Sequence, residues 1–167
     1  MRDFDDNDFP LAYLITFRCY GTWLHGDERR SMSRKQNLYG TPRIQPKPGL
    51  EQAEVRQLKH PLFTLGLRQR KVVEQAVREV CLHRRYLLRA VNVRTNHVHS
   101  IVSAMCKPEP ILDAFKSYST RALRNCGLLG PDIKGRARHG STIYLWKERD
   151  VAEATAYVLL GQDKPFR

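Results

Sequence analysis

Two apolar segments on either side of Thr95-Asn96 constrain the fold of this chain most strongly. Tyr86–Arg94 and His97–Ala104 have the composition and length of β-strands. Only two residues separate them, and asparagine tolerates the backbone geometry of a tight turn. The sequence therefore predicts an antiparallel β-hairpin in the middle of the chain.

The second strand of this hairpin carries two different faces. Because successive side chains of a strand point to opposite sides, Val98 and Val102 are expected to face the helices. His97, His99 and Ile101 are expected to face the opposite, open side. Two imidazoles projecting together from one strand form a cradle for a divalent metal with positions left open.

The histidine pair also has simpler interpretations. Both rings can be exposed to solvent or hydrogen-bonded without a functional role. A structural zinc site would need further cysteine or histidine ligands, and Cys81 with His83 gives no convincing second pair. The metal interpretation is preferred because the rings share the polar side of a strand whose other side is apolar.

Periodicity predicts five further elements around the hairpin. They are a strand at Leu11–Tyr20, a helix at Leu67–Arg84, a helix at Pro110–Asn125, a strand at Thr142–Trp146 and a helix at Glu148–Leu160. In the first strand, Tyr13, Ile15, Phe17 and Cys19 would face the core. The order predicts an α+β fold on the ferredoxin-like split βαβ plan, with an antiparallel sheet, helices on one face and an extra C-terminal helix.

The 167 residues are expected to form one domain with a long basic insertion at about 21–60. Glycine and proline interrupt this segment repeatedly, and arginine and lysine charge it. A segment of that length inside a domain is either functional or a solvated surface loop. The sequence does not decide between the two.

The charge balance points to a polyanionic partner. Lysine and arginine total 29 against 17 acidic residues, a formal net charge of +12. Nucleic acid is the first candidate and an anionic membrane surface the second. No segment is apolar enough to span a membrane, and the acidic start MRDFDDNDF is unlike a secretory signal. Four cysteines without a CxxC pattern suggest reduced thiols, so we expect a cytoplasmic, nucleoid-associated protein that is not secreted.

Metal-assisted chemistry on a phosphate needs a nucleophile, either water or a side-chain oxygen. Tyr118 and Tyr157 are the two tyrosine candidates. With Ile111, Phe115 and Ala122, Tyr118 follows helical spacing, which predicts a buried core aromatic.

Tyr157 has a different position on its helix. The apolar stripe there is Val151, Ala154, Thr155 and Val158, and Tyr157 lies beside it. Its ring can pack while its hydroxyl reaches outward. Glu153 lies one turn earlier on the same side, and Gln162 follows the expected helix stop at Gly161.

These motifs resemble a known family. TNHVHSIV is similar to the HUH motif (histidine, bulky apolar residue, histidine) of the single-tyrosine HUH transposases. YVLLGQDKP, with HGSTIYLW before it, is similar to their C-terminal tyrosine helix. The nearest branch is the REP-associated tyrosine transposases and their insertion-sequence relatives. The resemblance covers most of the chain, including the first strand, the hairpin and the SYSTRAL helix.

The resemblance implies a ferredoxin-like fold and a metal-dependent nuclease. By position, it implies that His97 and His99 ligate Mg²⁺ or Mn²⁺ and that Tyr157 is the nucleophile. The tyrosine would attack single-stranded DNA to give a 5′-phosphotyrosine and a free 3′-OH, and the reverse reaction would rejoin strands. Gln162 is the implied third ligand and Glu153 the alternative, because the family often places Gln or Asn one turn after the tyrosine, where this chain has Gly161.

The resemblance further implies a homodimer that recognises imperfect hairpin DNA, with no small-molecule cofactor. Basic residues are expected to contact the DNA backbone. The candidates are Arg18, Arg29, Arg30, Arg34, Lys35, Lys116, Arg121, Lys134, Arg136 and Arg138. Tyr20, Trp23 and Trp146 are candidates for stacking on unpaired bases.

Three other functions compete with this one. A domesticated, catalytically weak or inactive relative would still bind hairpin or single-stranded DNA without cutting it. A two-histidine phosphoesterase would need a second His-x-Ser/Thr motif, which only His139-Gly140-Ser141 approaches. An RNA-binding sheet is disfavoured because the hairpin strands lack paired aromatics.

Overall fold

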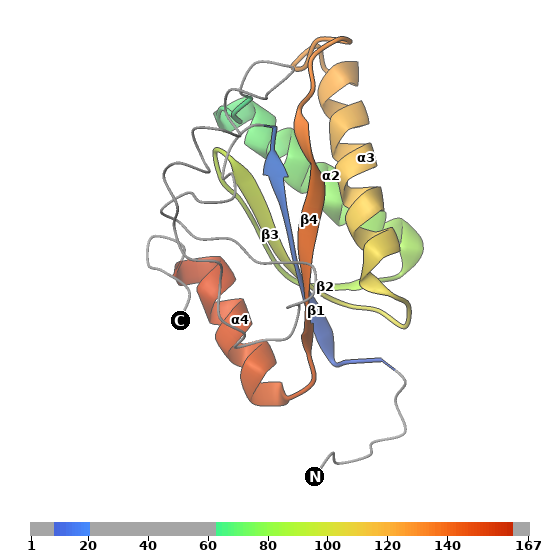
Figure 1. Ribbon diagram of the computed structural model, residues 1–167, viewed down its shortest axis with the longest axis vertical. Helices are drawn as coiled ribbons and strands as arrows, with labels where there is room; N and C mark the ends of the chain where they lie inside the picture. The colour runs from blue at the N-terminus through green and yellow to red at the C-terminus, as the bar shows by residue number, and fades with distance from the viewer. Residues whose placement is uncertain (1–8, 21–62, 162–167) are drawn as a thin grey trace.

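The computed structural model describes residues 9–20 and 63–161. The insertion at 21–60, with Arg29, Arg30, Arg34 and Lys35, lies outside the described residues, as do Trp23 and Gln162. The described elements, in chain order, are β1 (Ala12–Cys19), α2 (Leu67–Arg84), β2 (Leu87–Val93), β3 (His97–Ser103), α3 (Pro108–Asn125), β4 (Arg136–Leu145) and α4 (Glu148–Leu160) (Figure 1).

The four strands form one antiparallel sheet in the order β2-β3-β1-β4. The α+β class and the antiparallel sheet predicted from the sequence are therefore confirmed. The central strand β1 pairs with β3 on one side and with β4 on the other. Its alternating side chains divide the apolar residues between two faces of the sheet.

Helices α2 and α3 cover one face (Figure 1). Tyr13, Ile15 and Phe17 of β1 pack there against Val77 of α2 and Phe115 of α3, and all five are buried. The apolar residues of both helices recur at helical spacing, so each helix presents one continuous buried stripe. The predicted direction of the odd-numbered β1 residues is confirmed.

Helix α4 covers the other face of the sheet (Figure 1). Leu14 and Ile101 pack there against Ala154 and Val158. The expectation that the histidine side of β3 is open is therefore wrong, because α4 lies over it and leaves Ile101 fully buried. Helix α4 also places Tyr157 next to His99.

Two local predictions are corrected. Strand β4 begins at Arg136 rather than Thr142, because β1 also pairs with the basic segment: Cys19 pairs with Arg136 and Phe17 with Gly140, with a register shift between them. Gly140 permits this close pairing, since a Cβ atom there would lie 2.6 Å from the carbonyl oxygen of Thr16. Tyr118 is 39% exposed rather than buried, and Ser119 takes its place in the α3 stripe.

Candidate metal and nucleophile site

The histidine pair lies at the start of β3, on the α4 face of the sheet. In the antiparallel pairing of β3 with β1, His97 lies opposite Arg18 and His99 lies opposite Thr16. The two imidazole centroids lie 4.6 Å apart, with an interplanar angle of 67°. His99 is only 4% exposed, whereas His97 is half-buried. The two rings therefore project from the same side of β3, as the sequence predicts.

Each histidine has an oxygen at its Nδ1 atom. Nδ1 of His97 lies 2.6 Å from Oδ1 of Asn96, and Nδ1 of His99 lies 2.6 Å from Oγ1 of Thr16. An amide oxygen only accepts, so Nδ1 of His97 is the donor. A hydroxyl oxygen can accept in the same way from His99. With a proton on Nδ1, Nε2 of each ring is the nitrogen that can ligate a metal.

This arrangement fits a divalent cation with open coordination positions. Histidines that ligate metals commonly donate their other ring N–H to an oxygen, which fixes the tautomer and the ring orientation. Within residues 9–20 and 63–161, no group of three or more His, Cys, Asp or Glu side chains forms a complete metal site. The pair therefore offers two ligands, and no His, Cys, Asp or Glu of these ranges joins them as a third.

Of the two candidates for a third ligand, Glu153 lies within the described residues and Gln162 does not. The side chain of Glu153 is 55% exposed on α4, and its Oε1 lies 4.0 Å from Nε of Arg149. It does not complete a three-residue metal cluster with His97 and His99 in the described part of the chain. Gln162 follows the last described residue, Gly161.

Tyr157 lies directly against His99 of the histidine pair. Its ring packs edge-on to His99, with 5.5 Å between the centroids and an interplanar angle of 61°. The side chain is half-buried beside the buried stripe of α4, as its place on the helix predicts. Both groups belong to the same chain, so this contact forms without a second copy.

A hydrogen bond from β2 holds the end of α4 in this position. Nδ2 of Asn92 donates to the carbonyl oxygen of Val158 at 2.9 Å, and Asn92 is the β2 partner of His99. A Cβ atom at Gly161 would lie 3.2 Å from Cα of Tyr157, so glycine allows the chain to pass closely over that turn. The sequence does not predict the roles of Asn92 and Thr16, because these depend on strand register, nor that of Asn96, because it depends on the side-chain conformation in the turn.

The competing tyrosine is placed elsewhere. Tyr118 belongs to α3, which covers the opposite face of the sheet, and the guanidinium of Arg121 lies 5.2 Å from its ring centroid. Of the two candidates, only Tyr157 has a ring contact with a histidine of the pair.

Six candidate DNA-binding cations lie within the described residues, in several different places: Arg18, Lys116, Arg121, Lys134, Arg136 and Arg138. Arg18 lies beside His97 on the α4 face, because directly paired residues point to the same side of a sheet. Lys116, Arg121 and Arg136 line one pocket on the α3 side. Arg138 is exposed on β4.

The aromatic candidates differ in exposure. Nζ of Lys134 lies 4.7 Å from the ring centroid of Tyr20, which is buried. Trp146 is half exposed and stacks on Tyr144, with 6.4 Å between centroids and 13° between planes. Trp146 therefore has the accessible ring that base stacking requires.

Comparison of the chain with protein-family profiles, with curated proteins and with solved structures finds no match. None of the described helices is long and apolar enough to cross a membrane.

Proposed function

We propose that this protein is a metal-dependent single-stranded DNA endonuclease and strand transferase of the single-tyrosine HUH type. The contact between the Tyr157 ring and His99, at 5.5 Å, is the observation that supports it most strongly. This contact brings together the HUH motif and the tyrosine helix, which are the two motifs on which the resemblance rests. A tyrosine, two imidazoles and a strongly basic chain are the components that a phosphotyrosine nuclease needs.

The proposed fold assignment is the ferredoxin-like plan with an added tyrosine helix. The order β1, α2, β2, β3, α3, β4 along the chain, with spatial order β2-β3-β1-β4, supports it. In this plan the histidines lie on a central strand and the additional helix α4 covers them. The sheet then serves as the rigid platform for both catalytic elements.

In the proposed reaction, Oη of Tyr157 attacks the phosphorus of a DNA phosphodiester. The new bond joins the tyrosine oxygen to phosphorus, and the bond from phosphorus to the 3′ oxygen breaks. The phenolic proton leaves the nucleophile, and the departing 3′ oxygen gains a proton to become a free 3′-OH. Attack by another 3′-OH on the phosphotyrosine reverses the step and joins two strands.

His97 and His99 would hold Mg²⁺ or Mn²⁺, and Thr16 and Asn96 would fix the two rings through their Nδ1 atoms. When bound, the cation supplies charge neutralisation at the scissile phosphate. A phenol with an ordinary pKa of about 10 is a weak nucleophile at neutral pH and benefits from such a neighbour. Gln162 remains the proposed third ligand.

The proposed substrate is single-stranded or hairpin DNA, bound by a homodimer in the cytoplasm near the nucleoid. The net charge of +12 supports a polyanionic substrate. An unpaired strand reaches a half-buried tyrosine without the cost of opening a duplex. Affinity for DNA should therefore fall steeply with added salt.

The test uses one hairpin oligonucleotide taken from DNA flanking the gene, labelled in separate samples at its 3′ or 5′ end. With Mn²⁺, the 3′-labelled strand should form a labelled covalent adduct with the protein, because the 5′-phosphate side stays on the tyrosine. The 5′-labelled strand should release a short fragment and leave no label on the protein. Tyr157→Phe should abolish the adduct, and the matched control Tyr118→Phe should retain it.

A second function is a DNA-binding module without strand cleavage. The sequence favours it at one position, because Gly161 stands one turn after Tyr157, where the resembling family often places a Gln or Asn ligand. In the same experiment it predicts retention of the hairpin by wild type and by Tyr157→Phe alike, with no adduct in either. Adduct formation that depends on Tyr157 excludes this alternative.

A further inference from the structure

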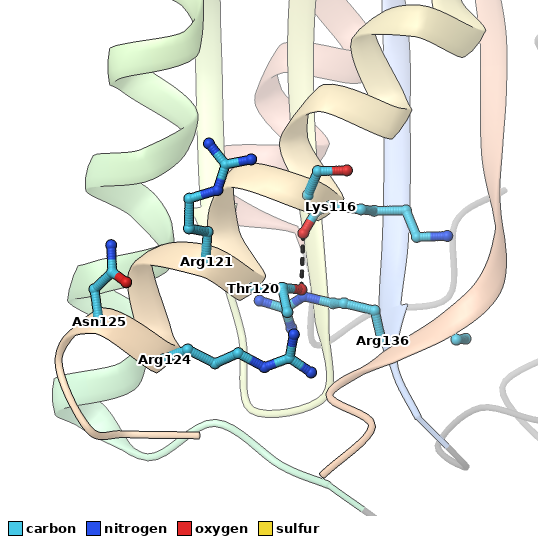
Figure 2. Close-up of a pocket in the computed structure, with 8 residues that line it drawn as sticks. Lys116, Thr120, Arg121, Arg124, Asn125 and Arg136 are labelled. Atoms are coloured by element: carbon cyan, nitrogen blue, oxygen red, sulfur yellow. Dashed lines mark hydrogen bonds between the residues drawn. The ribbon is translucent and has the colours of Figure 1, made fainter. Parts of the chain in front are cut away.

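A pocket of about 580 Å³ lies between the C-terminal half of α3 and the first residues of β4 (Figure 2). Its volume falls within the range of about 300–1,000 Å³ common for ligand sites. It lies on the α3 side of the sheet, whereas the histidine pair lies on the α4 side. The lining residues include four cations and no acid: Lys116, Ser117, Thr120, Arg121, Arg124, Asn125, Arg136 and Ala137.

Arg136 is the unusual member of this set. Its side chain is only 7% exposed, yet it carries a charge that no described carboxylate neutralises. Its Nη1 donates to Sγ of Cys19 at 3.5 Å, and its guanidinium lies 5.2 Å from the Phe17 ring centroid. Its Nε and Nη2 atoms have no hydrogen-bond partner among residues 9–20 and 63–161.

An arginine in this state is costly for a folded protein. A buried charge is tolerated when it is paired, and a buried donor without an acceptor forfeits its hydration. Cys19 does not supply the missing charge, because burial raises the pKa of its thiol and keeps it neutral at physiological pH. The guanidinium thus lacks the anion that would balance it.

A second arginine faces the same space. Figure 2 shows Arg124 extending from α3 toward Arg136 of β4, across the pocket. Arg124 is exposed and its Nη2 atom makes a long contact of 3.5 Å with the carbonyl oxygen of Ile133. Thr120 lies between them on the lining, and its hydroxyl donates to the carbonyl oxygen of Lys116 at 2.9 Å.

The local potential is positive. Burial lowers the pKa of Lys116, and the charges of Arg136 and Lys134 lower it further, against the opposing effect of Asp113. Nζ of Lys116 donates to the carbonyl oxygen of Arg138 at 2.8 Å, which ties α3 to β4 at the rim of the pocket. Two guanidinium groups held in a positive field are suited to a phosphate, whose oxygens accept their paired N–H groups.

We propose that this pocket binds a phosphate group of a single-stranded nucleic acid, held by Arg136 at its base and Arg124 at its rim. That the strand is the substrate DNA rests on the proposed function; the phosphate site itself does not. In β1, Arg18 pairs with His97 and the next residue, Cys19, pairs with Arg136. The pocket and the histidine pair therefore flank one end of β1 on opposite faces, so a strand passing around the β4 edge reaches both.

The experiment measures two ligands on the full-length protein at constant ionic strength. Inorganic phosphate is followed by the shift in melting temperature, and a single-stranded oligonucleotide by fluorescence anisotropy. The variants are Arg136→Met, Arg124→Gln and the control Arg89→Gln, an exposed arginine on β2 at the opposite edge of the sheet. Circular dichroism establishes that each variant is folded, and the exposed Arg124 serves if Arg136→Met does not fold.

We expect phosphate to raise the melting temperature of wild type and Arg89→Gln but not of the two pocket variants. Oligonucleotide affinity should fall about tenfold or more in the pocket variants, because each loses charge-assisted hydrogen bonds to phosphate. The slope of log affinity against log salt should drop by about one. Tyr157→Phe should behave as wild type here, so loss of catalysis leaves this test intact.

Equal phosphate and oligonucleotide responses in the pocket variants and in Arg89→Gln would overturn the proposal. A phosphate response that depends on Arg136, combined with unchanged oligonucleotide affinity, would overturn the nucleic-acid assignment and identify free phosphate as the ligand.

Discussion

Thr16→Val removes one hydroxyl from beneath the histidine pair and keeps the side-chain shape. The hydroxyl lies 2.6 Å from Nδ1 of His99, and His99 is only 4% exposed, so water cannot replace the lost partner. A buried polar atom left without a partner costs about 1–3 kcal/mol of stability. For a chain of this size, about 2–4 °C of melting temperature corresponds to each kcal/mol, so a decrease of about 2–12 °C is expected.

The same substitution should weaken metal binding. The oxygen at Nδ1 orients the His99 ring, and removing such a partner commonly costs about 10–100-fold in metal affinity. Denaturant unfolding gives the stability change, and isothermal calorimetry with Mn²⁺ gives the affinity. Thr142→Val is the matched control, because Thr142 lies on β4 opposite Ile15, on the other face of the sheet. Equal stability and equal Mn²⁺ affinity in the two variants would refute the role assigned to Thr16.

Three further predictions concern other parts of the structure. Gly140→Ala should lower stability by about 1–3 kcal/mol in denaturant unfolding, because its Cβ would lie 2.6 Å from the Thr16 carbonyl oxygen; an unchanged midpoint would contradict this. Burial raises the pKa of Tyr13 to about 12 from 10.0, so the neutral phenol is favoured in the folded state. The free energy of unfolding should therefore fall as pH rises from about 10 to 12, and less so in Tyr13→Phe, which pH-dependent denaturation measures. Glu153→Gln should leave Mn²⁺ affinity within twofold in calorimetry, because the carboxyl is exposed beside Arg149; a tenfold loss would restore Glu153 as a ligand.

Local patterns were sufficient for most of the fold. The bounds predicted for α2 and α4 agree with the structure, because a helix is encoded in the spacing of nearby apolar residues. The hairpin around Thr95-Asn96 was found for a similar reason. The direction of the β1 side chains followed from simple alternation. Each of these signals lies within about 20 residues of sequence.

Predictions failed where a distant partner decides the conformation. The segment from Arg136 to Gly140 is basic and contains glycine, and only pairing with β1 makes it a strand. The sequence predicts Tyr118 in the core at i+7 from Ile111, but the buried residues of α3 follow i+4 steps from Ile111 through Phe115 and so reach Ser119 instead.

In the candidate site too, some features follow from nearby sequence and others depend on residues far away in the chain. His97 and His99 share a side because of strand geometry, which the sequence predicts. The oxygen of Thr16 at Nδ1 of His99 requires the register of β1 against β3, whereas that of Asn96 comes from the residue next to His97 and depends on the conformation of the turn. The burial of Arg136 could not be predicted from the sequence either, because the segment around it is typical of a basic loop.

The most direct test of the central claim is to identify the residue that carries the nucleotide after reaction with hairpin DNA and Mn²⁺. Nuclease digestion followed by tandem mass spectrometry of the tryptic peptides gives that residue. The account predicts a nucleotide joined through its 5′-phosphate to Tyr157. A nucleotide on any other side chain, or protein that binds the hairpin fully and carries none, would contradict it.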